Sequence, residues 1–159
     1  MLKMENIILD HTDRKILNLL QQDATLTVAQ IADQVGLSQT PCWKRIKRFE
    51  REGLIKGRVT LLDRNQLGLG VIVIVTVKTA DHSDQWLQTF AEGVSLIPEV
   101  VEFFRMSGDI DYLLKIVVRD ISDYDRIYRK LTKIAKLSDV SSSFTMQEIK
   151  STTVLPLSS

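Results

Sequence analysis

Apolar residues recur at helical spacing in three successive segments near the start of the chain. In the first they occupy positions 16, 17, 19 and 20, after Asp10 or Thr12, either of which can cap a helix. In the second they occupy positions 28, 31, 32 and 35, between Thr27 as a cap and Gly36 as a left-handed stop. The third, which Ser38 can cap, has an apolar face formed by Cys42, Ile46 and Phe49. The pattern predicts three short helices around a small common core.

The pattern changes after residue 62. Residues 63–70 combine polar side chains with two glycines, which is typical of a linker. A nearly continuous apolar run at 71–77 predicts a strand buried on both faces. Beyond it, the spacing predicts a helix at 83–97, strands at 100–106 and 112–118, a helix at 122–136 and a strand at 140–149. This βαββαβ order is the ferredoxin-like arrangement, so we predict an α+β chain with domains at 1–62 and 71–159 and a linker at 63–70.

The third predicted helix carries a cationic face opposite its apolar one. Seven Lys and Arg residues lie between positions 44 and 58 against two Glu, in a chain whose net charge is +1. Alone, such a run is usually a solvated helix face. After a short helix and a Gly-Leu-Ser turn, it favours a recognition helix that enters the major groove of DNA, with 54–61 as an extended wing. The candidate DNA contacts are Ser38, Gln39, Thr40, Trp43, Lys44, Lys47, Arg48, Arg51 and Arg58.

Three segments together resemble the Lrp/AsnC family of transcription regulators. They are DRKIL at 13–17, GLSQTPCWKRIKRFEREGLI at 36–55 and SGDIDY at 107–112. The resemblance spans nearly the whole chain and implies an N-terminal winged helix-turn-helix, a linker and a C-terminal small-molecule domain. It implies a sequence-specific DNA-binding regulator that responds to a free amino acid.

In this family the turn at 106–111 lies between dimers and binds the amino acid. The resemblance therefore places an effector site at Met106, Ser107, Gly108, Asp109 and Asp111, completed by Ser142, Ser143, Phe144 and Thr145 of the facing subunit, with Ile121 as a further residue of the site. A carboxylate suits the ligand ammonium, and free turn N–H groups suit its carboxylate. The apolar members favour leucine or methionine. From the residues alone, the Gly-Asp turn also fits an ordinary hairpin turn or an isolated metal pair, of which the turn is favoured.

Assembly follows from the apolar strand and from the resemblance. A sheet that is apolar on both faces and covered by two helices on one side favours packing against a second copy, so we expect a homodimer. The family commonly closes four dimers into an octamer. An alternative function is a nucleoid-architectural protein whose C-terminal domain serves only assembly.

Other functional classes find little support in the sequence. No nucleophile elbow, P-loop or Cys/His pair is present, so we do not expect an enzyme, a cofactor or a metal site. One cysteine forms no internal disulfide, and Cys42 is interpreted as a core residue rather than a redox sensor. No signal peptide or membrane span is recognisable, which predicts a cytoplasmic, nucleoid-associated protein without a membrane partner.

Overall fold

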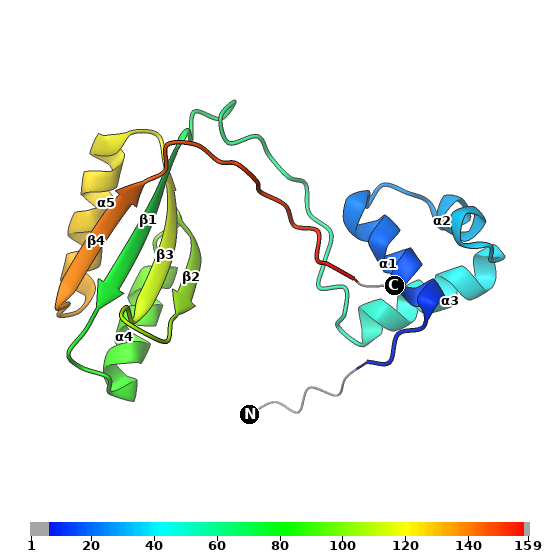
Figure 1. Cartoon of the computed structure of the whole chain (residues 1–159), viewed down its shortest axis with the longest axis horizontal. Coiled ribbons are helices and arrows are strands. Elements are labelled where there is room, and N and C mark those ends of the chain that lie inside the picture. Colours follow the sequence, from blue (N-terminus) through cyan, green and yellow to red (C-terminus); the bar gives the residue numbers. More distant parts are fainter. Residues whose placement is uncertain (1–6, 158–159) are drawn as a thin grey trace. The chain divides into compact units, whose positions relative to one another are not determined.

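The computed structural model describes residues 7–157, which form two compact units. Within the described residues, one unit comprises 7–61 together with 150–157, and the other comprises 62–149. The first contains helices α1 (His11–Gln22), α2 (Val28–Val35) and α3 (Gln39–Arg51), as the apolar spacing predicts (Figure 1). Their core includes Ile16, Ile31, Cys42, Ile46 and Phe49.

Reciprocal caps define where α1 and α2 begin. Asp10 accepts the backbone N–H of Asp13 while Asp13 accepts that of Asp10, and Thr27 and Gln30 form the same capping box at α2. Gly36 ends α2 at φ 70°, a conformation that favours glycine. Ser38 occupies the N-cap position of α3, but its side chain makes no capping hydrogen bond.

The predicted wing contains no strand. Ile55 packs against the helical core, and the backbone N–H groups of Leu54 and Ile55 both donate to the carbonyl of Phe49. Within the described part of the chain, no strand occurs between α3 and residue 71, so segment 54–61 lacks the β-hairpin of a wing.

The end of the chain joins the first unit rather than the ferredoxin-like one. Gln21 of α1 donates through its amide to the carbonyl of Leu155 (2.9 Å) and accepts the backbone N–H of the same residue (2.8 Å). Leu157 packs against the helical core. The expected second domain, 71–159, extends past the observed unit, which ends at residue 149, because apolar and amide contacts hold residues 150–157 on the helical unit.

The second unit has the predicted βαββαβ order. Its elements are β1 (Val71–Lys78), α4 (Asp84–Ser95), β2 (Val100–Arg105), β3 (Tyr112–Val118), α5 (Ile121–Ile134) and β4 (Asp139–Phe144). The sheet order is β2-β3-β1-β4 and every pair is antiparallel. β4 is shorter than the predicted strand at 140–149 because its last pairing is with the start of β1: Thr145 donates to the carbonyl of Ile72, and the chain then leaves the sheet.

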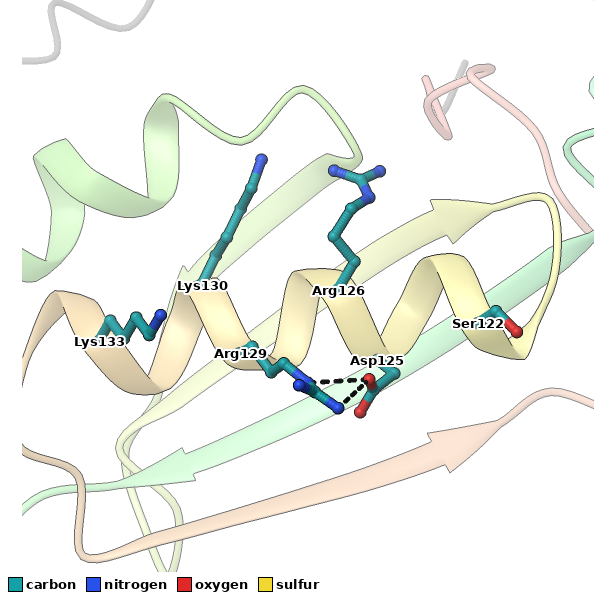
Figure 2. A pocket seen from close by; sticks show the side chains of 6 residues that line it. All are labelled: Ser122, Asp125, Arg126, Arg129, Lys130 and Lys133. Carbon is teal, nitrogen blue, oxygen red and sulfur yellow. Dashed lines mark hydrogen bonds and ion pairs between the residues drawn. The ribbon is translucent and has the colours of Figure 1, made fainter.

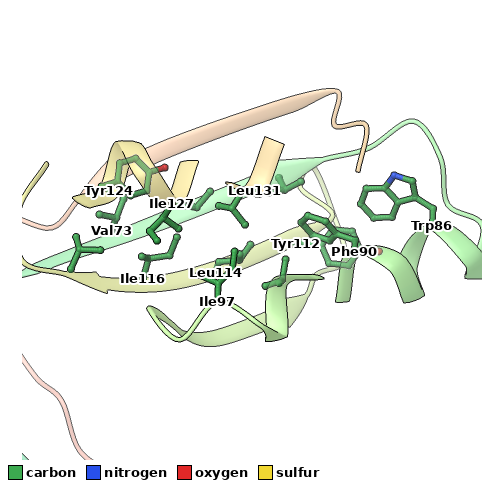
Figure 3. Close-up of a cluster of buried hydrophobic side chains, with 14 residues drawn as sticks. Val73, Trp86, Phe90, Ile97, Tyr112, Leu114, Ile116, Tyr124, Ile127 and Leu131 are labelled. Carbon is green, nitrogen blue, oxygen red and sulfur yellow. The ribbon is translucent and has the colours of Figure 1, made fainter. Parts of the chain in front are cut away.

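Both helices cover the same face of this sheet. Alternate residues of β1 and β3 pack against Trp86 and Phe90 of α4 and against Ile127 and Leu131 of α5, all of them buried (Figure 3). The opposite face is not covered by either helix. It carries Ile74, Thr76, Phe104, Leu113 and Val117, which the register places on the same side.

Candidate nucleic-acid interface and effector site

The outer side of α3 presents a compact polar and cationic face. At 100° per residue, Thr40, Lys44, Lys47 and Arg51 lie within about 60° of one another, opposite the buried Cys42, Ile46 and Phe49. Ser38, Gln39 and Thr40 are exposed at the helix start, and the Trp43 indole is 48% exposed. Burial of Cys42 raises the pKa of its thiol, which disfavours a reactive thiolate. The face therefore offers hydrogen-bonding groups at one end and cations along its length.

Two of the cations on α3 are used inside the helical unit. Arg45 donates to Asp10 (2.6 Å) and to Asp13 (2.5 Å), and Arg48 donates to the other oxygen of Asp13 (2.6 Å). Asp13 is 1% exposed, so its carboxylate depends on these two guanidinium groups. The hydrogen bonds to Asp10 and Asp13 raise the pKa of Arg45. Arg48, which the sequence placed among the DNA contacts, thus holds α3 against α1.

The remaining cations are exposed to different extents. Lys47 donates to Glu50 (2.7 Å), and Arg58 donates to the second oxygen of that carboxylate (3.2 Å). The hydrogen bond from Lys47 lowers the pKa of Glu50, which stays ionised. The Arg51 side chain is 75% exposed. Among the residues that the structure describes, no carboxylate lies within 4.0 Å of the Lys44 ammonium.

The turn at 106–111 is tied to the end of β1. Met106 donates to the carbonyl of Asp111 (2.8 Å), and the backbone N–H of Asp111 donates to the carbonyl of Val77 (3.0 Å). The Asp111 carboxylate accepts the backbone N–H of Thr79 (2.8 Å), while its other oxygen lies 3.8 Å from Nδ1 of His82. Gly108 has φ 120°, a value that favours glycine. Asp111 therefore fixes the turn through one oxygen and leaves the other near the surface.

The other predicted effector residues lie on or just after β4 and at the start of α5, and β4 is separated from β3 by β1. Phe144 packs edge-on against Tyr124, whose hydroxyl hydrogen-bonds to Ser142, and burial raises the pKa of that phenol. Ile121 begins α5 and is 68% exposed. Thr145 donates to the carbonyl of Ile72, which lies five residues along β1 from Val77, the pairing partner of Tyr112.

The ten predicted effector residues thus form two clusters in one chain. The turn cluster consists of Met106, Ser107, Gly108, Asp109 and Asp111, and the strand cluster consists of Ile121, Ser142, Ser143, Phe144 and Thr145. The β4 residues lie beside Ile72 to Val75 of β1 and the turn lies beside Val77, so the clusters are separated along β1 by about 7–17 Å, at about 3.3 Å per residue. One chain does not bring them together. Among the described residues, no group of three or more His, Cys, Asp or Glu could hold a metal ion.

Across the described residues, no helix combines the length and apolar character needed to cross a membrane.

Comparison with known proteins identifies both units. Residues 9–56 match a winged helix-turn-helix DNA-binding domain, and residues 72–155 match the Lrp/AsnC ligand binding domain. The chain is 53% identical over 149 residues to the glutamate uptake regulatory protein of Zymomonas mobilis, covering 94% of this chain and 91% of that protein.

Solved structures of related proteins match nearly the whole chain. An AsnC family transcriptional regulator from Agrobacterium tumefaciens superposes with a TM-score of 0.90 at 53% identity, covering 93% of this chain and 97% of that one. A transcriptional regulator from Neisseria meningitidis, solved in complex with L-Met, superposes with a TM-score of 0.88 at 33% identity, covering 94% and 97%. The chain belongs to the Lrp/AsnC family, whose members are DNA-binding transcriptional regulators and not enzymes.

Proposed function

We propose that this regulator reads a specific DNA sequence with α3 and that a free amino acid modulates its DNA binding or its assembly. The observation that carries the first part is the exposed face of α3, where cations stand opposite a fully buried apolar stripe. Such a helix, after a second helix and a tight turn, has the geometry that enters the major groove. The protein would act on nucleoid DNA in the cytoplasm.

Within this face, different residues have different tasks. Lys44, Lys47 and Arg51, with Arg58 beyond the helix, supply cations for phosphate oxygens, which position a protein on the duplex. The exposed residues that can meet base edges stand near the helix start, and they are Ser38, Gln39, Thr40 and Trp43. Arg48 is left out because its guanidinium is committed to Asp13.

We propose leucine or methionine as the effector, bound between the turn cluster of one copy and the strand cluster of another. The apolar side chains Met106, Phe144 and Ile121 are all exposed in the single chain. Such exposure is expected if these side chains form a pocket only when a second copy is present. The Asp111 oxygen that does not accept from Thr79, which lies 3.8 Å from Nδ1 of His82, can meet the ligand ammonium. The L-Met complex of the Neisseria regulator supports an apolar ligand in a related domain.

Assembly is part of the same proposal. The face of the sheet that neither helix covers presents Ile74, Phe104, Leu113 and Val117, and a two-fold copy of the same face buries them. A dimer also carries two copies of α3 to successive major-groove turns, about 34 Å apart. Further association of dimers to an octamer would join the turn cluster to the strand cluster.

Replacing Lys44 and Arg51 by Gln tests the DNA face. Each lost phosphate contact lowers the slope of log affinity against log salt by about 0.9, so the double variant should lose about 1.8 per bound protomer. Binding at low salt should weaken about ten- to a hundred-fold on any duplex. Fluorescence anisotropy across a salt series measures both quantities.

The matched control removes the same charge elsewhere, with Lys78 and Lys150 replaced by Gln. Both side chains are exposed and lie outside α3. If the control and the double variant lose affinity equally, α3 has no special role, and the assigned face is wrong.

A further inference from the structure

A second row of cations lies on α5, far along the chain from the DNA face. Arg126, Arg129, Lys130 and Lys133 occupy positions i, i+3, i+4 and i+7 of one helical stripe. With Ser122 and Asp125 they line an open hollow of about 490 Å³ (Figure 2). The opposite side of α5 is buried in the core through Tyr124, Ile127 and Leu131, so the stripe faces away from the sheet.

The positive charge of the second unit is concentrated at this stripe. Residues 126–136 contain five Lys or Arg and no Asp or Glu. The rest of residues 62–149 contains five Lys or Arg against thirteen Asp or Glu. A cationic strip on an otherwise acidic unit attracts a polyanion to one place rather than to the whole surface.

Internal ion pairs use only part of this charge. Arg126 donates to Glu99 (2.6 Å), and Arg129 donates to Asp125 (2.9 Å). Among the residues that the structure describes, no carboxylate lies within 4.0 Å of the ammonium groups of Lys130 and Lys133. Figure 2 shows the Lys130 and Arg126 side chains extended to the same side of α5. Two flexible ammonium groups therefore remain available to an external anion.

We propose that this α5 stripe binds the phosphate backbone of the DNA that α3 reads, an inference that rests on the proposed function. From Arg126 to Lys133 the stripe is about 10 Å long, which spans about three nucleotides of one strand at about 3.4 Å of duplex axis each. Apart from Asp125, which is paired with Arg129, its side chains are Arg, Lys and Ser, which contact phosphate oxygens readily and carry no aromatic or amide group for base edges. The contact is independent of DNA sequence and adds length to the bound duplex.

Lysine acetylation of the full chain, with and without a long mixed-sequence duplex at low salt, tests this directly. Mass spectrometry should show that DNA slows acetylation of Lys130 and Lys133 several-fold, as it does for Lys44 on α3. Lys78 and Lys150 should react at the same rate in both samples. Protection of Lys44 without protection of Lys130 and Lys133 would overturn the α5 contact and leave the proposed function standing.

Two other outcomes are equally informative. If Lys44 is not protected either, the DNA face on α3 fails, and the α5 contact fails with it. If Lys78 and Lys150 are protected as strongly as Lys130 and Lys133, DNA shields the protein generally, and the stripe has no special role.

A charge-removing variant supplies the second readout. Lys130→Gln with Lys133→Gln should lower the salt slope on the long duplex by about 1.8 per bound protomer, at about 0.9 for each lost contact. Both side chains are exposed, so the circular dichroism spectrum should be unchanged. Lys78→Gln with Lys150→Gln should leave the slope as it is, and an unchanged slope in the Lys130 and Lys133 variant overturns the proposal.

Discussion

Replacing Asp13 by Ala should lower the free energy of unfolding of the helical unit by about 3 kcal/mol. The carboxylate is 1% exposed and receives hydrogen bonds from Arg45 and Arg48, which would lose a charged partner at the helix interface. Both guanidinium groups keep access to solvent. The loss of stability should therefore lie at the lower end of the range for breaking a buried ion pair. The reciprocal cap of α1 also loses one side, at about 1 kcal/mol.

Urea unfolding followed by Trp43 fluorescence measures this in a Trp86→Phe background, because the chain has only two tryptophans. DNA binding should fall with stability, although Asp13 lies off the DNA face. Asp33→Ala is the matched control, since Asp33 is exposed on α2, and it should change stability by less than about 0.5 kcal/mol. If Asp13→Ala unfolds at the same urea concentration as the control, the ion pairs of Asp13 with Arg45 and Arg48 contribute nothing to the stability of the helical unit.

Replacing Leu113 by Lys should separate the assembled protein into monomers. Leu113 lies on the open face of the sheet, paired with Phe104 of β2 and Thr76 of β1. If a second copy packs on that face, the new ammonium loses its hydration, and the neighbouring carboxylate on the face, Glu102, is already paired with Lys115 (3.1 Å), so the change costs several kcal/mol. The dissociation constant of the dimer should therefore rise by about 100-fold or more. Sedimentation velocity over a concentration series measures the change.

The control for that experiment is Leu96→Lys, because Leu96 is 83% exposed at the end of α4. It should assemble like the parent. A Leu113→Lys protein that keeps the parent's mass at every concentration would place the interface elsewhere. The monomer should also bind DNA more weakly than the parent, since two linked recognition helices gain from effective concentration.

The helices and strands could be predicted from the spacing of apolar residues along the chain. Apolar stripes that include Ile16, Ile31 and Ile46 predict one helix each, and the apolar run at 71–77 predicts the central strand. The tail was not predictable in this way, because residues 150–157 have no periodicity. Their position depends on Gln21 and Leu155, which are 134 residues apart.

The site was partly predictable for a similar reason. Charge spacing on α3 identifies Lys44 and Arg51 as outward residues, but it cannot show that Arg48 reaches Asp13 on another helix. The cations of α5 also repeat at helical spacing, a signal that is easily read as ordinary solvation. The separation of the two effector clusters needs the strand register, which periodicity alone does not supply.

The effector proposal gives Asp111 two separable tasks. Asp111→Asn keeps an oxygen that can accept the N–H of Thr79 and removes the charge that would meet a ligand ammonium. This variant should fold and bind DNA like the parent while losing about ten- to a hundred-fold in amino-acid affinity. It therefore serves as the matched control for the response to the effector.

The most direct test compares DNA affinities of the full chain with and without saturating L-leucine or L-methionine. One duplex is a fragment that the protein enriches from genomic DNA, and the other is its scrambled version, at the same salt. We expect the enriched fragment to bind at least about 10³-fold more tightly, and one amino acid to change that affinity about 5- to 150-fold in the parent but not in Asp111→Asn. Equal affinities for both duplexes, with no response to either amino acid, would contradict an effector-controlled, sequence-specific regulator.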